Sequence, residues 1–479
     1  MKAERFWRFN KQDKIEIDER GLVKFLEQLG YASYYTMSNK TSEPVYVFRS
    51  GYIVESIIPS RIHTDTIRAL ASGIIDEDIL PPATRNDVLS KLMGSKMILK
   101  KEVTLALTEL DKPMKSDTKD SAYFFYRNNA VKVTRDIIQL LPTDQLDFYV
   151  WKSQIIDRDF ELIDLETIIA KSEYYKFLMN VSMRPVNGKL EYDPERMNNL
   201  FRLQGYLLHD YKDRANPRAV VLMDVSDKGE PSGRTGKGLI IDGISQLKKT
   251  IKEDGKSFKD DNRFKFSLVT IDSKVVYLDD VPEKFNFENF FSVISEGISV
   301  ELKFVNKFYI PYDFSPKIAI STNYAITGRG SSNEARKYEY ELSNFYSEKH
   351  TPSDDFGHLL FYAWDSYQWN MFDYLMMYSV QEYLDKGVAS SVCINDKYNK
   401  LLAETGKQFT DWITTFDLNY KFRYEKAVLY RDYVNHCEGC PDVNRLMFCK
   451  RLQVYAKIYG IKTTESHSGY ERYIEFAVV

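Results

Sequence analysis

The sequence predicts an α/β core that lies between an α+β N-terminal part and a C-terminal part of helices followed by two strands. Between residues 217 and 321, short apolar runs alternate with helical segments. This alternation is typical of a mostly parallel sheet, which binds its ligand at the carboxyl ends of its strands. After about residue 400, three helical segments precede two strand-like segments. The length of 479 residues fits about three domains.

The composition is that of an ordinary globular chain. Lys and Arg number 66 and Asp and Glu 69, which gives a net charge of −3, and 43% of the residues are hydrophobic. These values exclude a histone-like polycation and an acidic disordered chain. Any contact with nucleic acid must therefore come from local basic patches.

The four cysteines are too few to staple a chain of this length. The N-terminus lacks the apolar segment of a signal peptide, and no window of about 18 residues is apolar throughout, so we expect a cytoplasmic protein without a membrane partner. Cys437 and Cys440 have the spacing of zinc ligands. A second regular pair is missing, which favours a loop and a core cysteine over a zinc site.

The first half of the chain divides at a polar segment with helix breakers, residues 110–120. Residues 1–110 combine a helix near 21–30 with a strand at 44–48, and they show no Asp-x-Asp strand of a primase, so we predict an accessory domain without priming activity. Residues 111–215 combine strands at 122–126 and 130–134 with helices from 160 onward. The sheet domain is predicted for 216–385 and a last domain for 400–479.

The sheet domain is predicted from short, continuous apolar runs, which are typical of strands buried on both faces, and from the helical segments between them. The expected strands are 218–223, 265–270, 274–278 and 317–321, and the expected helices are 237–251 and 286–295.

A glycine-rich segment, Gly-Glu-Pro-Ser-Gly-Arg-Thr-Gly-Lys-Gly at 229–238, follows the first of these strands and opens an apolar helix. Such a turn directs backbone N–H groups and a lysine at phosphate oxygens. Pro231 stands where the first glycine of the usual pattern belongs, and Gly238 replaces the hydroxyl residue that binds magnesium. A glycine-rich surface turn remains the alternative on this segment alone. The predicted ATP-binding residues are Ser232, Gly233, Arg234, Thr235, Gly236, Lys237, Gly238 and Leu239.

Two further strands end in polar side chains. Asp279 and Asp280 follow an apolar strand, and they are suited to holding Mg²⁺ and polarising water respectively, although a solvated acidic turn would look the same. Asn323 ends another strand and could bind the attacking water or the γ phosphate. Because Lys237, the aspartates and Asn323 occur in this order within 86 residues, the sequence predicts nucleotide hydrolysis.

Residues 298–312 form two strand-like stretches about a short turn. Lys303 and Lys307 lie beside aromatic residues there, and such a hairpin offers phosphate contacts and stacking faces to a single nucleic-acid strand. An edge hairpin protected by lysines is the alternative interpretation.

These motifs, with the segments 328–347 and 350–358, resemble the superfamily 3 helicases of DNA viruses, phages and plasmids, most closely the primase-helicase type. The resemblance implies an AAA+ P-loop ATPase core with a helical collar, Mg²⁺ and ATP as cofactors, a hexameric ring and movement along one DNA strand. It assigns Lys237 to phosphate, Asp279 to magnesium, Asp280 to the attacking water and Asn323 to the γ phosphate. It also implies an arginine finger toward the neighbouring subunit, best matched by Arg336, with Arg329 second. Thr235 or a water could replace the hydroxyl missing at Gly238.

The C-terminal part has the outline of a winged helix, with helices at 408–413, 425–436 and 443–459 before strands at 461–464 and 473–478. Residues 421–479 hold ten Lys and Arg against seven Asp and Glu, so this part is locally basic. Lys450 and Arg451 are its predicted DNA-binding residues. A solvated helix face or a protein contact remains the alternative.

The predicted function is an ATP-dependent replicative DNA helicase of a phage or mobile element, which acts on single-stranded and forked DNA as a homo-oligomer. A separate primase or polymerase is a candidate partner. Two alternatives stand beside it. One is an AAA+ initiator or loader that remodels DNA or a partner without processive unwinding, and the other, motivated by Gly238, is a DNA-binding scaffold that does not hydrolyse ATP.

Overall fold

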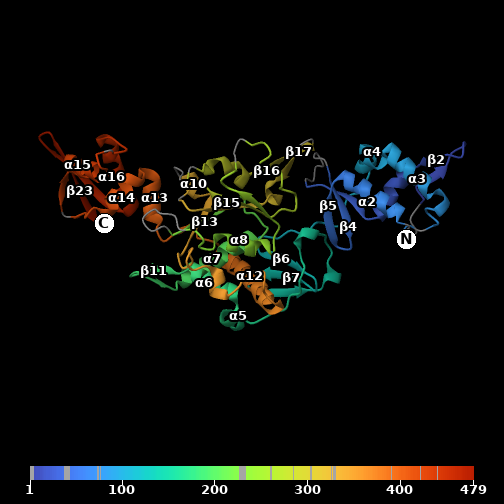
Figure 1. Cartoon of the computed structure of the whole chain (residues 1–479), viewed down its shortest axis with the longest axis horizontal. Helices are drawn as coiled ribbons and strands as arrows, with labels where there is room; N and C mark the ends of the chain where they lie inside the picture. The colour runs from blue at the N-terminus through green and yellow to red at the C-terminus, as the bar shows by residue number, and fades with distance from the viewer. Residues whose placement is uncertain are drawn as a thin grey trace.

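The protein is extended, with a central body between two smaller units (Figure 1). In this computed structural model the N-terminal unit lies at one end and the C-terminal unit at the other. The structure describes residues 5–36, 44–72, 75, 77–225, 233–258, 262–283, 285–302, 305–324, 326, 331–389, 391–420, 422–439 and 441–478.

The N-terminal unit has its own apolar core, in which Leu22, Phe25 and Leu26 of the first helix are buried. That helix begins where the Asp18 carboxylate accepts the N–H of Gly21. The sheet has the order β3-β4-β5-β9, so its last strand comes from beyond residue 110 and pairs in parallel with β5. The elements are β1 (Trp7–Phe9), β2 (Ile15–Ile17), α1 (Glu19–Gln28), β3 (Tyr31–Tyr34), β4 (Val45–Ser50), β5 (Ile53–Ile57), α2 (Pro59–Ala71), α3 (Pro82–Ser95), α4 (Lys101–Leu105) and β9 (Val150–Trp151).

The next region joins a small sheet of order β10-β6-β7-β8 to a group of helices. Helices α7 and α12 lie against each other so closely that a Cβ on Gly205 would stand 2.1 Å from the carbonyl oxygen of Ser379. The Arg158 guanidinium binds the buried Asp373 carboxylate of α12 at 2.5 and 2.6 Å. The elements are β6 (Ser121–Tyr126), β7 (Ala130–Thr134), β8 (Ile138–Leu141), β10 (Ile155–Ile156), α5 (Leu165–Lys171), α6 (Glu173–Val181), β11 (Arg184–Val186), β12 (Lys189–Glu191), α7 (Pro194–Leu208) and α12 (Ser366–Lys386).

The central sheet has six strands, all parallel, in the order β14-β15-β18-β13-β19-β20. One face packs on α7, α8 and α12, and the other face packs on the segments around residues 266–294. Because the strands run in one direction, all their carboxyl ends lie at one edge, as the sequence predicts. The elements are β13 (Ala219–Asp224), α8 (Lys237–Ser245), β14 (Thr250–Asp254), β15 (Val275–Val281), β18 (Lys317–Thr322), β19 (Lys337–Leu342) and β20 (Ser391–Val392).

Three of the four predicted core strands are confirmed, and the fourth is wrong. Residues 265–268 form turns and 269–270 are irregular, and Phe266 and Val269 are buried under the sheet while Leu268 is 59% exposed. The helix predicted for 237–251 ends at Ser245, because 250–254 form strand β14. Neither β14 nor β19 is predicted from the sequence.

The remaining elements match the predictions in part, and the helix predicted for 286–295 is a 3-10 turn over 287–290 followed by a short α-helix. The hairpin predicted for 298–312 is β16 paired with β17, and the C-terminal helices and strand pair are present, with a short strand β21 completing a sheet of order β21-β23-β22. These elements are α9 (Phe291–Ser295), β16 (Gly297–Leu302), β17 (Val305–Pro311), α10 (Ser331–Glu334), α11 (Pro352–Phe356), α13 (Asp396–Thr405), α14 (Lys407–Thr415), β21 (Arg423–Glu425), α15 (Lys426–His436), α16 (Arg445–Tyr459), β22 (Ile461–Ser468) and β23 (Glu471–Val478).

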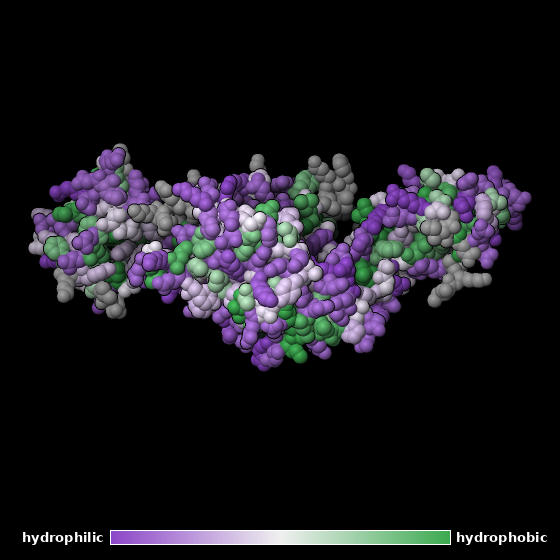
Figure 2. All heavy atoms as spheres, turned by 60° about the horizontal axis from the view of Figure 1, so that its bottom comes forward, coloured by the Kyte–Doolittle hydropathy of each residue, from purple (hydrophilic) through white to green (hydrophobic). Residues whose placement is uncertain are grey.

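Polar side chains cover most of the face drawn in Figure 2, and apolar ones gather there in a few patches. Among the exposed apolar residues, Ile137 and Leu162 line one shallow depression of the helical region together with Tyr374. No helix within the described ranges is long and apolar enough to cross a membrane.

Candidate nucleotide site

The backbone directly before α8 lies very close to helix α6. Gly236 has a φ of 107° and stands directly before the first residue of α8, Lys237, and Arg234 also has a left-handed φ of 65°. A Cβ on Gly236 would lie 2.8 Å from the ring of Phe177 in α6. Only glycine combines that φ with that contact, so the path of the chain into the helix depends on Gly236. Among the described residues no side chain caps the first N–H groups of α8, and groups of this kind bind anions.

Lys237 joins the ends of two neighbouring strands. Its ammonium donates to Asn323 Oδ1 at 2.8 Å and to a carboxylate oxygen of Asp224. The side chain is only 11% exposed. Since β18 lies between β13 and β15 in the sheet, the residues that end these three strands are neighbours at one edge. A strand, a glycine-rich turn and a helix joined in this way within a parallel sheet are consistent with a P-loop-like core.

Asp224 is a residue of this site that the sequence analysis missed. It ends β13, its side chain is fully buried, and its carboxylate accepts the Thr235 hydroxyl as well as Lys237. Burial raises the pKa of Asp224, the nearby Asp280 adds to the rise, and Lys237 and Thr235 oppose it. The signal for Asp224 was present in the sequence, because an apolar strand that ends in a carboxylate is the pattern that identified Asp279 and Asp280.

Asp280 is connected directly to this network, and Asp279 is connected through a serine. Asp280 lies in a bulge of β15 with a φ of 56°, and its carboxylate accepts Asn323 Nδ2 at 3.3 Å and Lys256 Nζ at 2.5 Å. Asp279 accepts the hydroxyls of Tyr277 at 2.7 Å and Ser321 at 2.8 Å. The Ser321 hydroxyl oxygen also accepts the N–H of Asp280 at 2.8 Å.

The oxygen atoms at this edge suit a divalent cation that arrives with phosphates. Magnesium in such sites takes one or two carboxylates and completes its shell with water and phosphate oxygens. Within the described ranges there is no group of three or more His, Cys, Asp and Glu that would hold a metal by itself. Gly238 offers no hydroxyl, and a Cβ there would meet nothing within 4 Å. The edge can therefore bind a phosphate chain through Lys237 and the open N–H groups, with carboxylates beside it.

Arg336 lies at the opposite edge of the sheet. Its carbonyl oxygen accepts the N–H of Ala219, the first residue of β13, at 2.8 Å. Its guanidinium lies 4.6 Å above the ring of Phe291 and donates to Ser295 Oγ at 3.3 Å. A strand of this length separates Arg336 from Lys237 by roughly 17–20 Å. Arg336 is thus not part of its own chain's phosphate site.

Other predicted residues lie apart from this edge or outside the described part of the chain. Lys450 is exposed on α16, whereas Arg451 pairs with Asp442 at 2.9 Å within the C-terminal unit. Cys437 packs against the core of that unit, and burial raises the pKa of its thiol. Outside the described residues lie Ser232, Lys303, Arg329, Cys440 and the side chain of Lys307.

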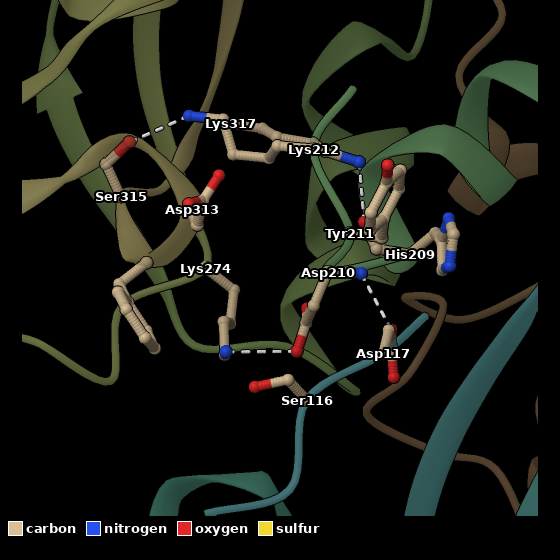
Figure 3. Close-up of a pocket in the computed structure, with 11 residues that line it drawn as sticks. Ser116, Asp117, His209, Asp210, Tyr211, Lys212, Lys274, Asp313, Ser315 and Lys317 are labelled. Carbon is tan, nitrogen blue, oxygen red and sulfur yellow. Dashed lines mark hydrogen bonds and ion pairs between the residues drawn. The ribbon is translucent and has the colours of Figure 1, made fainter. Parts of the chain in front are cut away.

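A second polar cluster surrounds a cavity of about 160 Å³ at the amino edge of the sheet (Figure 3). Asp210 accepts Lys274 Nζ at 3.0 Å and Lys248 Nζ at 2.9 Å, and all three side chains are largely buried. Lys317 donates to the carbonyl oxygens of Tyr206 at 2.6 Å and His209 at 2.5 Å. These bonds tie the segment after α7 to the first residues of β15 and β18.

Comparisons with protein-family models and with curated proteins found no match. Among solved structures, the chain is similar to the A-form apo structure of the NrS-1 C-terminal region, with a TM-score of 0.42 and 14% identity over 96% of this chain and 99% of that one. The A-form apo structure of the NrS-1 C-terminal region 305–718 matches with a TM-score of 0.30 and 11% identity over 74% and 96% of the two chains. Likeness of this degree says nothing of activity.

Proposed function

We propose that the chain is an ATP-dependent DNA helicase of superfamily 3 type. The observation that carries the proposal is the hydrogen-bonded series Asp224, Lys237, Asn323 and Asp280 at the carboxyl edge of a parallel sheet. It gathers a phosphate-binding lysine, a polar amide and carboxylates, and these are the groups that phosphoryl transfer from ATP to water requires.

Each group has a distinct task in this proposal. Lys237 exchanges its internal partners for the β and γ phosphates, and Asn323 then bonds the γ phosphate or the attacking water. Asp280, held in its bulge by Ser321 and Lys256, polarises that water. Magnesium, when bound, neutralises charge on the phosphates. The carboxylate of Asp279, which Tyr277 and Ser321 hold, is its candidate ligand.

The position of Arg336 supports a ring of subunits. A guanidinium that cannot reach its own chain's site can serve a neighbour's nucleotide, where it stabilises the charge on the transferring phosphoryl group. The exposed apolar side chains of Ile137 and Leu162 offer a second surface for contact between copies. The proposed assembly is a hexamer that encloses a single DNA strand.

The C-terminal unit supports a contact with DNA of a second kind. Its order of helix, short strand, two helices and strand pair, with the sheet order β21-β23-β22, is that of a winged helix. Lys450 and Lys457 are exposed on its last helix, and Tyr470 stands fully exposed at the tip of the strand pair. Arg451 contributes to the fold of the unit through Asp442, and the exposed cations of the helix are Arg445, Lys450 and Lys457.

The proposal is tested with ATP hydrolysis and strand separation by the full chain. Lys237→Ala and Asp280→Asn should each lower phosphate release in the presence of single-stranded DNA by roughly 100-fold or more. Lys252→Ala, which removes an exposed lysine from the neighbouring strand β14, is the matched control and should leave the rate unchanged. Unaffected hydrolysis in Lys237→Ala would show that the site is assigned wrongly.

The alternative is an initiator or loader, which would use the same site. Forked DNA separates the two proposals. A helicase releases the displaced strand with a rate that depends on ATP, whereas hydrolysis without strand separation would favour an initiator or loader. A parent chain that binds DNA and releases no phosphate at all would instead favour a scaffold.

A further inference from the structure

Asp224 occupies an unusual position for a buried carboxylate. It ends the strand that comes before the glycine-rich segment, its side chain has no exposed surface, and one of its oxygens accepts Lys237 while the other accepts the Thr235 hydroxyl. Lys237 is the one cation within ion-pair distance of Asp224 among the described residues. The buried charge of Asp224 is thus balanced by Lys237, the lysine that we expect to turn to the phosphates when a nucleotide binds.

Binding of a nucleotide would remove that balance. When Lys237 moves to the phosphates, Asp224 keeps only a neutral hydroxyl as partner. A buried carboxylate without a counter-charge is strongly unfavourable, so a new cation has to take the place of the ammonium. The nucleotide itself brings one, because ATP arrives with a divalent cation.

The glycine-rich segment also lacks one of the usual ligands of this cation. In a P-loop the hydroxyl after the lysine binds magnesium, and here that residue is Gly238. The space beside Gly238 is open, since a Cβ there would meet no atom within 4 Å. The chain therefore has a buried carboxylate that needs a cation and, directly after the lysine that pairs with this carboxylate, a residue that lacks the oxygen a cation needs.

We propose that Asp224 binds the divalent cation of the bound nucleotide in place of the hydroxyl absent at Gly238. The inference rests on the proposed nucleotide site and adds a ligand to it from β13. Lys237 and the cation then alternate on one carboxylate, with the lysine bound when the site is empty and the metal bound when it is filled.

The experiment measures how much Mg²⁺ strengthens the binding of a non-hydrolysable, fluorescent ATP analogue to the full chain. For the parent, affinity in Mg²⁺ should exceed affinity in EDTA by about tenfold or more. Asp224→Asn should reduce this gain to about threefold or less, because an amide binds the cation weakly. Adding Gly238→Ser to Asp224→Asn should restore much of the gain by supplying the hydroxyl.

Asp254→Asn is the matched control, because Asp254 ends β14 at the same edge and is exposed. It should keep the full gain. A second measurement, the electron paramagnetic resonance of Mn²⁺ with the analogue bound, should show weaker manganese binding in Asp224→Asn. Thermal unfolding of each variant establishes that it is folded before binding is compared.

The possible failures are distinct. A parent chain that binds no analogue in either solution would overturn the nucleotide site and this inference with it. If Asp224→Asn keeps the full Mg²⁺ gain, the metal role of Asp224 is refuted and the site stands. If Asp224→Asn binds the analogue more tightly than the parent by the same factor in Mg²⁺ and in EDTA, Asp224 only restrains Lys237. This result also refutes the metal role.

Discussion

The two edges of the central sheet carry similar residues that are held in different ways. At the carboxyl edge, Lys237 has two side-chain partners, Asp224 and Asn323, and both can be exchanged for ligand atoms. At the amino edge, Lys317 is bonded to two backbone carbonyls, and Asp210 is shared between two buried lysines. Backbone partners cannot turn away without unfolding. The kind of partner, more than the residue types, separates a lysine that is free to act from one that supports the fold.

The largest effect is expected at the amino edge. Asp210→Ala would remove the carboxylate that pairs directly with both Lys248 and Lys274, and breaking a buried pair in this way costs about 3–5 kcal/mol. Urea denaturation should show this loss, and Asp254→Ala, the exposed carboxylate at the other edge, should show almost none. A loss below about 1 kcal/mol for Asp210→Ala would contradict the supporting role of this edge.

A smaller effect separates two glycines of the carboxyl edge. Gly236→Ala should cost roughly 2 kcal/mol or more, because alanine is strained at a φ of 107° and its Cβ would strike Phe177. Gly238→Ala should be neutral or stabilise by up to about 1 kcal/mol, since it lies within α8 and has open space beside it. Both are measured by thermal unfolding with and without ATP. Equal losses for the two variants would show that the turn is not held by Gly236.

The smallest effect is a dependence of stability on pH. Burial lowers the pKa of Lys212 at the amino edge from 10.5 to about 7. Between these values the unfolded chain binds more protons than the folded one, so this lysine makes stability rise with pH, by at most about 1.4 kcal/mol per unit. Lys212→Met should flatten the curve between pH 7.5 and 9.5, whereas Lys457→Met, an exposed lysine, should not. If the free energy of unfolding of Lys212→Met depends on pH as steeply as that of the parent, Lys212 does not have a lowered pKa.

The sequence allowed the site to be located, because three short apolar strands ended in Lys-, Asp- or Asn-bearing segments and parallel strands bring such ends together. It did not reveal the true number of strands. The segment 265–270 is as apolar as a strand, but it is not one, and its Phe266 and Val269 are buried all the same. An apolar segment that will be buried can therefore be a strand or an irregular segment, and its composition does not tell which. Strand β19 was missed because it carries three charged residues in six, and one of them, Glu341, is buried against a partner far along the chain. Glu341 accepts the N–H of Asn395 at 2.8 Å.

The roles of single residues depended on the fold in the same way. Asp224 looked like the end of a strand until the structure placed Thr235 and Lys237 on its carboxylate. Arg451 is a predicted DNA contact on a basic helix, and only the folded unit reveals that Asp442 also pairs with it. Pairings between distant segments cannot be deduced from local pattern, because helical and strand periodicity specify a face and not its partner.

The pairing of β9 with β5 affects how the protein is made on the ribosome. Strand β5 is complete once Ile57 has emerged, but its neighbour at Val150 and Trp151 follows after roughly 5 to 20 s of synthesis. Throughout that interval the nascent N-terminal unit displays an unpaired strand edge, which is open to other chains. The unit is also flanked by its own helices, α2 directly after β5, which reach the exit first. The sheet of this unit can therefore be completed only after β9 has been translated. Slower translation between the two strands would lengthen the period in which the unpaired edge of β5 can aggregate.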